Sequence, residues 1–230
     1  MSISLNSQTY DNLKRDIMTL ELPPGEPVSA AKIADRYQVS RTPAREALVK
    51  LETEGLVEIY PQSASVISKI DSQRAKQEWF IRRTLELGVV DSLFENVKKA
   101  DIQKMRSYAR MMEDLAVDTR DSEMAYEYLM CDNAFHAVTY YVAGQNLAGQ
   151  IVQNTMAHYN RVRILADIGS SLKKRTTTAH QKLIKCIEKK DKEGYRTLLM
   201  QHLGYFEEDI KNIEAANPSM FARGKKDKKN

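Results

Sequence analysis

The sequence predicts a mainly α-helical protein: three helices and a β-hairpin, followed by an all-α bundle of six to seven helices. Five of the six prolines fall within the first 61 residues, and the sixth is Pro218. The long stretch between them is rich in Leu, Ala, Met, Glu and Lys, which favour helices. The proline-rich beginning instead contains short helical and β-rich segments separated by turns.

The first 70 residues are expected to form one small domain. Apolar residues at three- and four-residue steps indicate a first helix that Pro23-Pro24-Gly25 ends: Tyr10, Leu13, Ile17 and Leu20. Two more helices are expected at about 30–37 and 41–54. Pro43 suits the first turn of the latter, where its missing N–H costs nothing. The β-rich runs 56–60 and 65–70 then form a hairpin around residues 61–64.

Residues 71–215 are expected to form the helical domain. Asp71-Ser72 offers an N-cap for its first helix. Helices are predicted at about 73–97, 101–118, 122–142, 146–167, 174–189 and 192–213. Residues 216–230 are expected to be a basic, disordered tail.

Bulk charge does not by itself argue for a nucleic-acid partner. The net charge is +4, but Arg223–Asn230 alone holds five basic residues and one acidic residue, while the first 70 residues hold eight basic and nine acidic ones. No apolar run approaches the length of a membrane span, and two cysteines are too few for a disulfide framework. A cytoplasmic protein is therefore expected, without a membrane partner.

Helix, helix, turn, helix and hairpin is the element order of a winged helix-turn-helix. The second helix of the pair must present polar side chains at its N-terminal end to enter the major groove, and here that end carries Arg41, Thr42 and Arg45. Arg41 and Arg45 share one helical face, and either has the donors to bind guanine. The alternative is that these arginines are simply solvated. Three further candidate contacts to DNA are Lys32, Arg36 and Lys50.

The run VSRTPAREALVKLETEGLVEI at 39–59, with LELPPGEPVSAAKIADRYQ before it, resembles the GntR superfamily of bacterial regulators. The resemblance implies that Arg41, Thr42 and Arg45 contact DNA, and that a homodimer reads a palindromic operator. Two departures stand out. Ala30-Ala31 replaces a usual Glu-Arg pair, so one arginine contact is missing, and the wing tip at 62–64 lacks the usual glycine.

Asp132 and His136 lie four residues apart, so both project from one face of a predicted helix. His180 is expected at the start of a later helix and His202 on the last one. Converging inside a bundle, these groups would bind a divalent metal. Spacing alone leaves the alternative that Asp132 and His136 form an N-cap-like or surface pair.

Three further segments resemble the FCD-type effector domain of the FadR branch of that superfamily. They are WFIRRTLELGVV at 79–90, DNAFHAVTYYVAGQNLAGQI at 132–151 and AHQKLIKCIEKKDKEGYRTLLMQHL at 179–203. The resemblance implies a metal held by Asp132, His136, His180 and His202. Zinc, nickel and manganese are all compatible with these ligands. His158 matches no ligand position and is expected on a pocket wall or at the surface.

The resemblance also implies an effector cavity lined by Arg82, whose guanidinium can hold a carboxylate through two hydrogen bonds. The alternative is a structural ion pair with Glu86, one turn later. Arg163 and Arg161 are further candidates on a later helix. The family often has Glu where this chain has Phe80, so we expect ligand preference to differ.

The sequence thus predicts a ligand-responsive DNA-binding transcription regulator, expected to be a repressor. A small organic acid would bind at the metal and shift the winged domains between two placements. One alternative is a metal-dependent hydrolase using the Asp/His centre, although no motif supplies a general base or nucleophile. Another is a metal that only stabilises the bundle.

Overall fold

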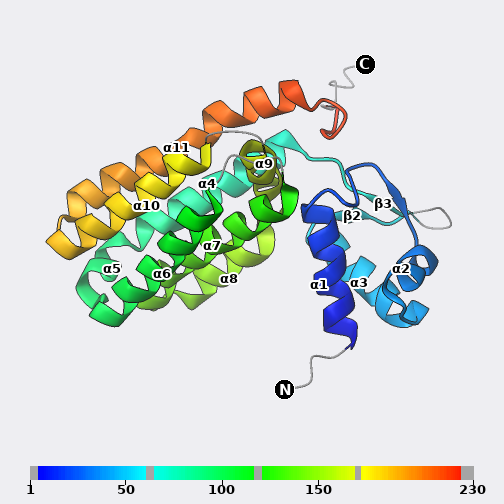
Figure 1. Ribbon diagram of the computed structural model, residues 1–230, viewed down its shortest axis with the longest axis horizontal. Coiled ribbons are helices and arrows are strands. Elements are labelled where there is room, and N and C mark those ends of the chain that lie inside the picture. The colour runs from blue at the N-terminus through cyan, green and yellow to red at the C-terminus, as the bar shows by residue number, and fades with distance from the viewer. Residues whose placement is uncertain (1–4, 61–64, 117–120, 169–171, 224–230) are drawn as a thin grey trace, which may run out of the picture.

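The computed structural model describes residues 5–60, 65–116, 121–168 and 172–223. Within them, a small N-terminal part with a β-sheet lies beside one end of an elongated helical bundle (Figure 1). The predicted mainly α fold class is confirmed. The hairpin tip at 61–64 and the last seven residues of the predicted tail lie outside the described residues.

The N-terminal part is a three-helix unit with a three-stranded antiparallel sheet of order β1-β3-β2. Its elements are α1 (Leu5–Met18), β1 (Pro27–Val28), α2 (Ala30–Tyr37), α3 (Arg41–Thr53), β2 (Val57–Glu58) and β3 (Ser65–Ile67). The strand β1 was not expected; it forms because Pro27 and Val28 pair with Val66 and Ser65. The first helix also ends earlier than expected, and Leu20 after it has a positive φ of 67°.

Local signals fix the turn between α2 and α3. The Ser29 side chain caps α2 by accepting from the Lys32 N–H, and Gln38 ends the helix in the left-handed region. Pro43 lies in the first turn of α3 as predicted, and the helix buries Ala44, Leu48 and Leu51 against α1. The N-terminal end of α3 is thereby held rigidly at the surface.

The bundle contains eight helical segments within the described residues. They are α4 (Ser72–Gly88), α5 (Val90–Asn96), α6 (Lys99–Leu115), α7 (Ser122–Val142), α8 (Asn146–Thr155), α9 (Ala157–Asp167), α10 (Leu172–Lys189) and α11 (Lys192–Ala216). Two helices expected to be continuous are divided, at Val89 and at Met156. Both residues are buried, and packing of their side chains offsets the interrupted helical hydrogen bonding. No described helix has the length and apolarity needed to span a membrane.

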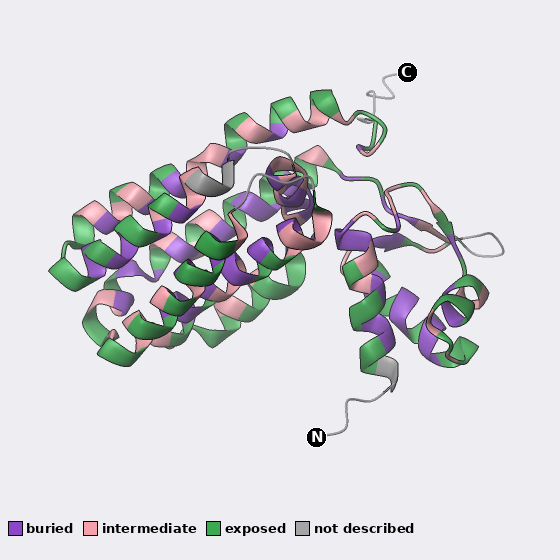
Figure 2. Cartoon of the chain, viewed as in Figure 1, coloured by how far each residue is buried: buried purple, intermediate pink, exposed green. Residues whose placement is uncertain are grey.

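The junction between the two parts is well packed. Asp71 caps α4 as predicted, accepting from the N–H groups of Gln73 and Arg74. The apolar core of the winged part continues onto the bundle through Leu129 of α7 and Ile164 of α9. Figure 2 colours the chain by burial and shows buried residues on the helices of both parts.

The beginning of the predicted tail is not a free end. Phe221 is 2% exposed, and the backbone of Ile70 donates to Met220 and accepts from Ala222 at 2.9 Å each. The expectation of disorder is therefore wrong for residues 217–223. Burial of the Phe221 side chain stabilises this segment, although the basic residues that follow it are typical of a disordered tail.

Candidate metal centre and DNA-contacting helix

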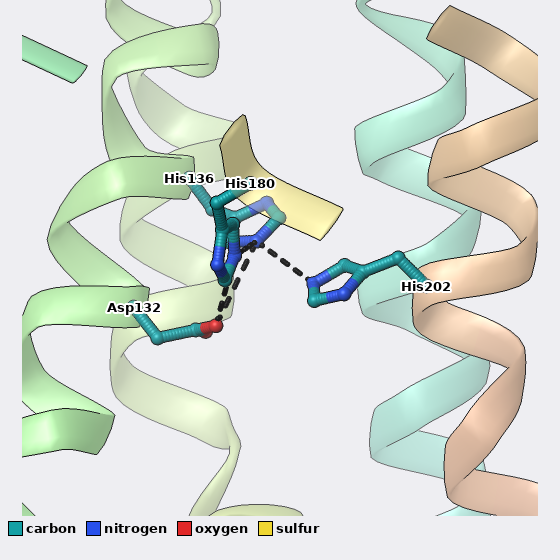
Figure 3. Close-up of side chains that lie close together, drawn as sticks. All are labelled: Asp132, His136, His180 and His202. Atoms are coloured by element: carbon teal, nitrogen blue, oxygen red, sulfur yellow. Dashed lines mark hydrogen bonds and ion pairs between the residues drawn. The ribbon is translucent and has the colours of Figure 1, made fainter. Parts of the chain in front are cut away.

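Four buried side chains from three helices converge in the bundle (Figure 3). Helix α7 supplies Asp132 and His136 from one face, α10 supplies His180, and α11 supplies His202. Each is at most 7% exposed. His180 lies in the middle of its helix and not at the start, so that part of the prediction is wrong.

The donor atoms of this cluster are close enough to share one cation. Asp132 Oδ1 lies 3.2 Å from His180 Nε2. His136 Nε2 lies 3.1 Å from His180 Nε2 and 3.3 Å from His202 Nε2. All four donor atoms lie within 4.8 Å of one another. Tetrahedral ligand bonds of about 2.0–2.2 Å to zinc separate neighbouring donors by about 3.3–3.6 Å.

The chemistry of the donors also fits a divalent cation. Asp132 Oδ1 is buried yet accepts no hydrogen bond of ordinary geometry from the described residues. Burial opposes ionisation of Asp132, but Arg163, His136 and Arg82 outweigh it and keep its pKa well below the usual range. Burial lowers the pKa of both His180 and His202. A carboxylate and neutral imidazoles are the forms that bind metal.

Glu86 orients one of the imidazoles. Its Oε2 lies 2.6 Å from His136 Nδ1, so the Nδ1–H tautomer leaves the Nε2 lone pair free for the centre. Burial alone would raise the pKa of Glu86, but His136 and Arg82 reverse the effect and lower it. From the sequence, Glu86 was identified only as a possible ion-pair partner of Arg82. Its contact with His136 depends on the packing of α4 against α7.

Both predicted effector-binding arginines contact the same acid. Arg82 donates to Asp132 Oδ2 at 3.2 Å, and Arg163 donates to that oxygen too. Arg82 also pairs with Glu86 at 2.6 Å, so the proposed structural ion pair and a position at the centre coexist. Oδ2 is thus held by arginines while Oδ1 faces the histidines.

A cavity of about 60 Å³ adjoins the centre, lined by Arg82, Arg163, Tyr159 and His202 among others. A second cavity of about 340 Å³ shares Arg175, His202 and Tyr205 with the first. Sequence reasoning missed Arg175 and Tyr159. Tyr159 lies one turn before Arg163, a spacing that could have placed it on the same face; nothing local indicated Arg175.

Three residues do not occupy the expected places. Arg161 does not line the cavity; it is 1% exposed and donates to the Ser68 carbonyl at 2.6 Å. His158 is on neither a cavity wall nor the surface, because its Nδ1 accepts from the Asp71 N–H at the junction. Phe80 is 60% exposed and does not line the cavity beside the centre.

The six candidate DNA contacts fall into two groups. Lys32 pairs with Glu26, Arg36 pairs with Asp16, and Lys50 lies over the ring of Tyr10. Arg41, Thr42 and Arg45 are exposed at the N-terminal end of α3. Among the described residues, no ion-pair partner engages Arg41 or Arg45. Their guanidinium groups are therefore available to an external acceptor, while the other three are already engaged.

A winged helix-turn-helix joined to a helical domain with a buried polar cavity defines the class of DNA-binding transcription regulators. Two family models match the chain: bacterial regulatory proteins of the gntR family at residues 5–67, and the FCD domain at residues 79–205. The chain belongs to the GntR family and carries an FCD domain. Both predicted resemblances are thereby confirmed.

Relatives span nearly the whole chain. The HTH-type transcriptional repressor RspR of Escherichia coli K12 is 27% identical and covers 95% of this chain and 94% of its own length. An HTH-type regulator in an unstable DNA locus of Streptomyces ambofaciens is 30% identical and covers 93% and 88%. The structure of E. coli McbR/YncC superposes with a TM-score of 0.75 at 19% identity, covering 94% and 99%. These are regulators and not enzymes, so the hydrolase alternative is set aside.

Proposed function

We propose that the chain is a metal-dependent, ligand-responsive repressor that binds a palindromic operator as a homodimer in the cytoplasm. The observation that carries the proposal is the convergence of Asp132 Oδ1 with three imidazole Nε2 atoms, beside a cavity lined by arginines. The repressor assignment is supported by the printed name of the E. coli relative. GntR-family regulators bind DNA and typically dimerise.

Zinc, nickel or manganese would be held by Asp132, His136, His180 and His202. Three nitrogens and one carboxylate oxygen are borderline ligands that suit these cations. When bound, the cation supplies a Lewis-acidic anchor for an anionic ligand. The positive charge of Arg82 and Arg163 favours the same ligand class, a small carboxylate. The 60 Å³ cavity limits its size.

Helix α9 connects the cavity to the DNA-binding part. On one face, Arg163 and Tyr159 border the cavity. On the other, Arg161 donates to both the carbonyl and the hydroxyl of Ser68, just after β3 of the wing. A ligand that draws Arg163 away from Asp132 would displace α9. The contacts of Arg161 with the winged part would then change as well.

On the DNA side, Arg41 and Arg45 are proposed to read base edges, with Thr42 contacting the backbone. The arginines lie one helical turn apart at the exposed end of a helix whose other face is buried. A guanidinium can bind the O6 and N7 atoms of guanine together. Lys32, Arg36 and Lys50 would contribute to phosphate binding after exchanging their present partners.

Fluorescence anisotropy with a DNA duplex taken from the region upstream of the protein's own gene tests the DNA contacts. Arg45→Ala should weaken binding about 5- to 150-fold, the effect of losing one bidentate base contact. Arg110→Ala on α6, also an exposed helical arginine, is the matched control and should bind normally. Equal affinity for Arg45→Ala, or no preference over a scrambled duplex, would contradict the proposal.

A purely structural metal remains the second candidate, because the cluster joins three helices of the bundle. The structural and the ligand-responsive role of the metal are distinguished by measuring how operator affinity responds to added carboxylate before and after chelation. If chelation lowers the melting temperature but leaves that response intact, the metal only stabilises the fold.

A further inference from the structure

The C-terminal end of the described chain folds back onto the linker between the two parts. Helix α11 runs from the far end of the bundle towards the winged part, and residues 217–222, here called the C-terminal strap, follow it (Figure 1). The strap lies beside residues 68–71, the linker between β3 and α4. The Ile70 N–H donates to the Met220 carbonyl, and the Ala222 N–H donates to the Ile70 carbonyl, both at 2.9 Å. The strap therefore satisfies both backbone groups of a buried linker residue.

Apolar contacts tie the same strap to helix α11. Phe221 of the strap is 2% exposed and Ile70 of the linker is 0% exposed. Both belong to one core cluster that also contains Phe206 and Ile210 of α11. These two residues follow His202 by four and eight positions, so all three lie on one face of the helix. One face of α11 thus carries a proposed metal ligand and the apolar anchor of the strap.

The strap completes the set of contacts that holds the linker. Helix α9 contacts the two ends of the linker, through Arg161 at the Ser68 carbonyl and His158 at the Asp71 N–H. The strap holds Ile70 between those ends. The linker backbone can change its direction only by breaking these hydrogen bonds, and its direction sets where the winged part lies on the bundle.

We propose that the C-terminal strap positions the winged part for operator binding and couples its placement to helix α11. A movement of α11 at His202 would carry the apolar anchor, the strap and the linker with it. This inference rests on the proposed function and deepens it, because it adds a second route of regulation beside the one through α9. Without the strap, only a fraction of the chains would have the placement that binds DNA, and the apparent affinity would fall by that fraction.

Trypsin cleavage of the Lys69–Ile70 bond, followed by mass spectrometry, measures whether the strap holds the linker. Lys69 is exposed, but cleavage requires the backbone around it to open. Ala222→Pro removes the N–H that the Ile70 carbonyl accepts. Cleavage should then be about 5-fold faster or more, the factor expected for the net loss of one backbone hydrogen bond. Ala222→Ser keeps the N–H and has an exposed side chain, so this matched control should be cut at the unaltered rate.

Operator affinity then shows whether the held linker matters for DNA binding. By fluorescence anisotropy with the same upstream duplex, Ala222→Pro should bind about 5-fold more weakly or worse than Ala222→Ser. Its metal-dependent rise in melting temperature should equal that of the unaltered chain, because the strap contributes no donor to the centre. General damage to the bundle would reduce that rise. Phe221→Ser, which removes the buried ring, is a second variant and should behave like Ala222→Pro.

Equal rates of cleavage after Lys69 in the unaltered chain, Ala222→Pro and Phe221→Ser would overturn the inference. Faster cleavage with unchanged operator affinity would also overturn it, because the strap would then hold the linker without positioning the winged part. Cleavage after the exposed Lys99, at the start of α6, should be the same in all variants, and a parallel increase there would count against the strap. An unaltered chain that prefers no operator would instead contradict the proposed function, and the cleavage rates distinguish that failure from a failure of the strap.

Discussion

Zinc, nickel or manganese added to the metal-free protein should stabilise the fold, because the four donors come together only in the folded chain. Burial already keeps the pKa of His180 and His202 low, so at neutral pH no proton must leave these rings. Arg82 and Arg163 oppose the cation by occupying the other oxygen of Asp132. Their positive charge limits the affinity of the centre for a cation but does not block Asp132 Oδ1.

The size of the effect follows from mass action. A cation at about 100 times its Kd stabilises the folded state by about 2.7 kcal/mol. For a chain of this length each kcal/mol raises the melting temperature by about 2–4 °C, so the expected rise is about 5–11 °C. Circular dichroism during heating, with and without each metal, measures it.

Two histidine variants make the comparison specific. His202→Ala removes one of the four donors and should lose most of the metal-dependent rise. His158→Ala removes the one histidine outside the cluster and should keep it, whatever its own melting temperature. The reasoning is refuted if no metal raises the melting temperature, or if His202→Ala shows the same rise as the unaltered chain.

Three further predictions concern the junction between the parts. Arg161→Met should lower the free energy of unfolding in urea by about 1–3 kcal/mol, because the buried Ser68 carbonyl loses its donor; unchanged stability would contradict this role. Burial and the charges of Arg161 and Arg74 lower the pKa of His158 from 6.5 to about 3. The unfolded chain therefore binds this proton first, and stability should fall by about 1.4 kcal/mol per unit as pH drops from 6.5 towards 3; His158→Gln should remove that slope, and parallel curves would refute it. Gly55→Ala should cost about 1–2 kcal/mol in the same assay, because Gly55 has a φ of +81° that alanine adopts poorly; an unaffected variant would show that the turn relaxes.

Much of the fold could be predicted because its signals are local. The helix at 122–142, the Asp71 cap and the turn before α3 depend on residues within a few positions of one another. The break at Met156 was missed because no proline or glycine lies there, and the break at Val89 was missed although Gly88 directly precedes it. Their cause is burial against distant helices, which a sequence pattern does not contain.

The candidate site could likewise be predicted only in part from the sequence. Asp132 and His136 share a face by spacing, but only the fold brings His180 and His202 to them, and their assignment depended on family resemblance. The orientation of α9 could not be predicted at all. Arg161 and Arg163 are two residues apart, so they project in different directions, and packing decides which one reaches the cavity.

The central claim is that the buried centre controls the affinity with which α3 binds DNA. The direct measurement is operator affinity by anisotropy for the metal-free and the zinc-loaded chain, each with and without acetate. The account predicts a change in affinity of about 5-fold or more that disappears in His202→Ala. Identical affinities in all four conditions would contradict it.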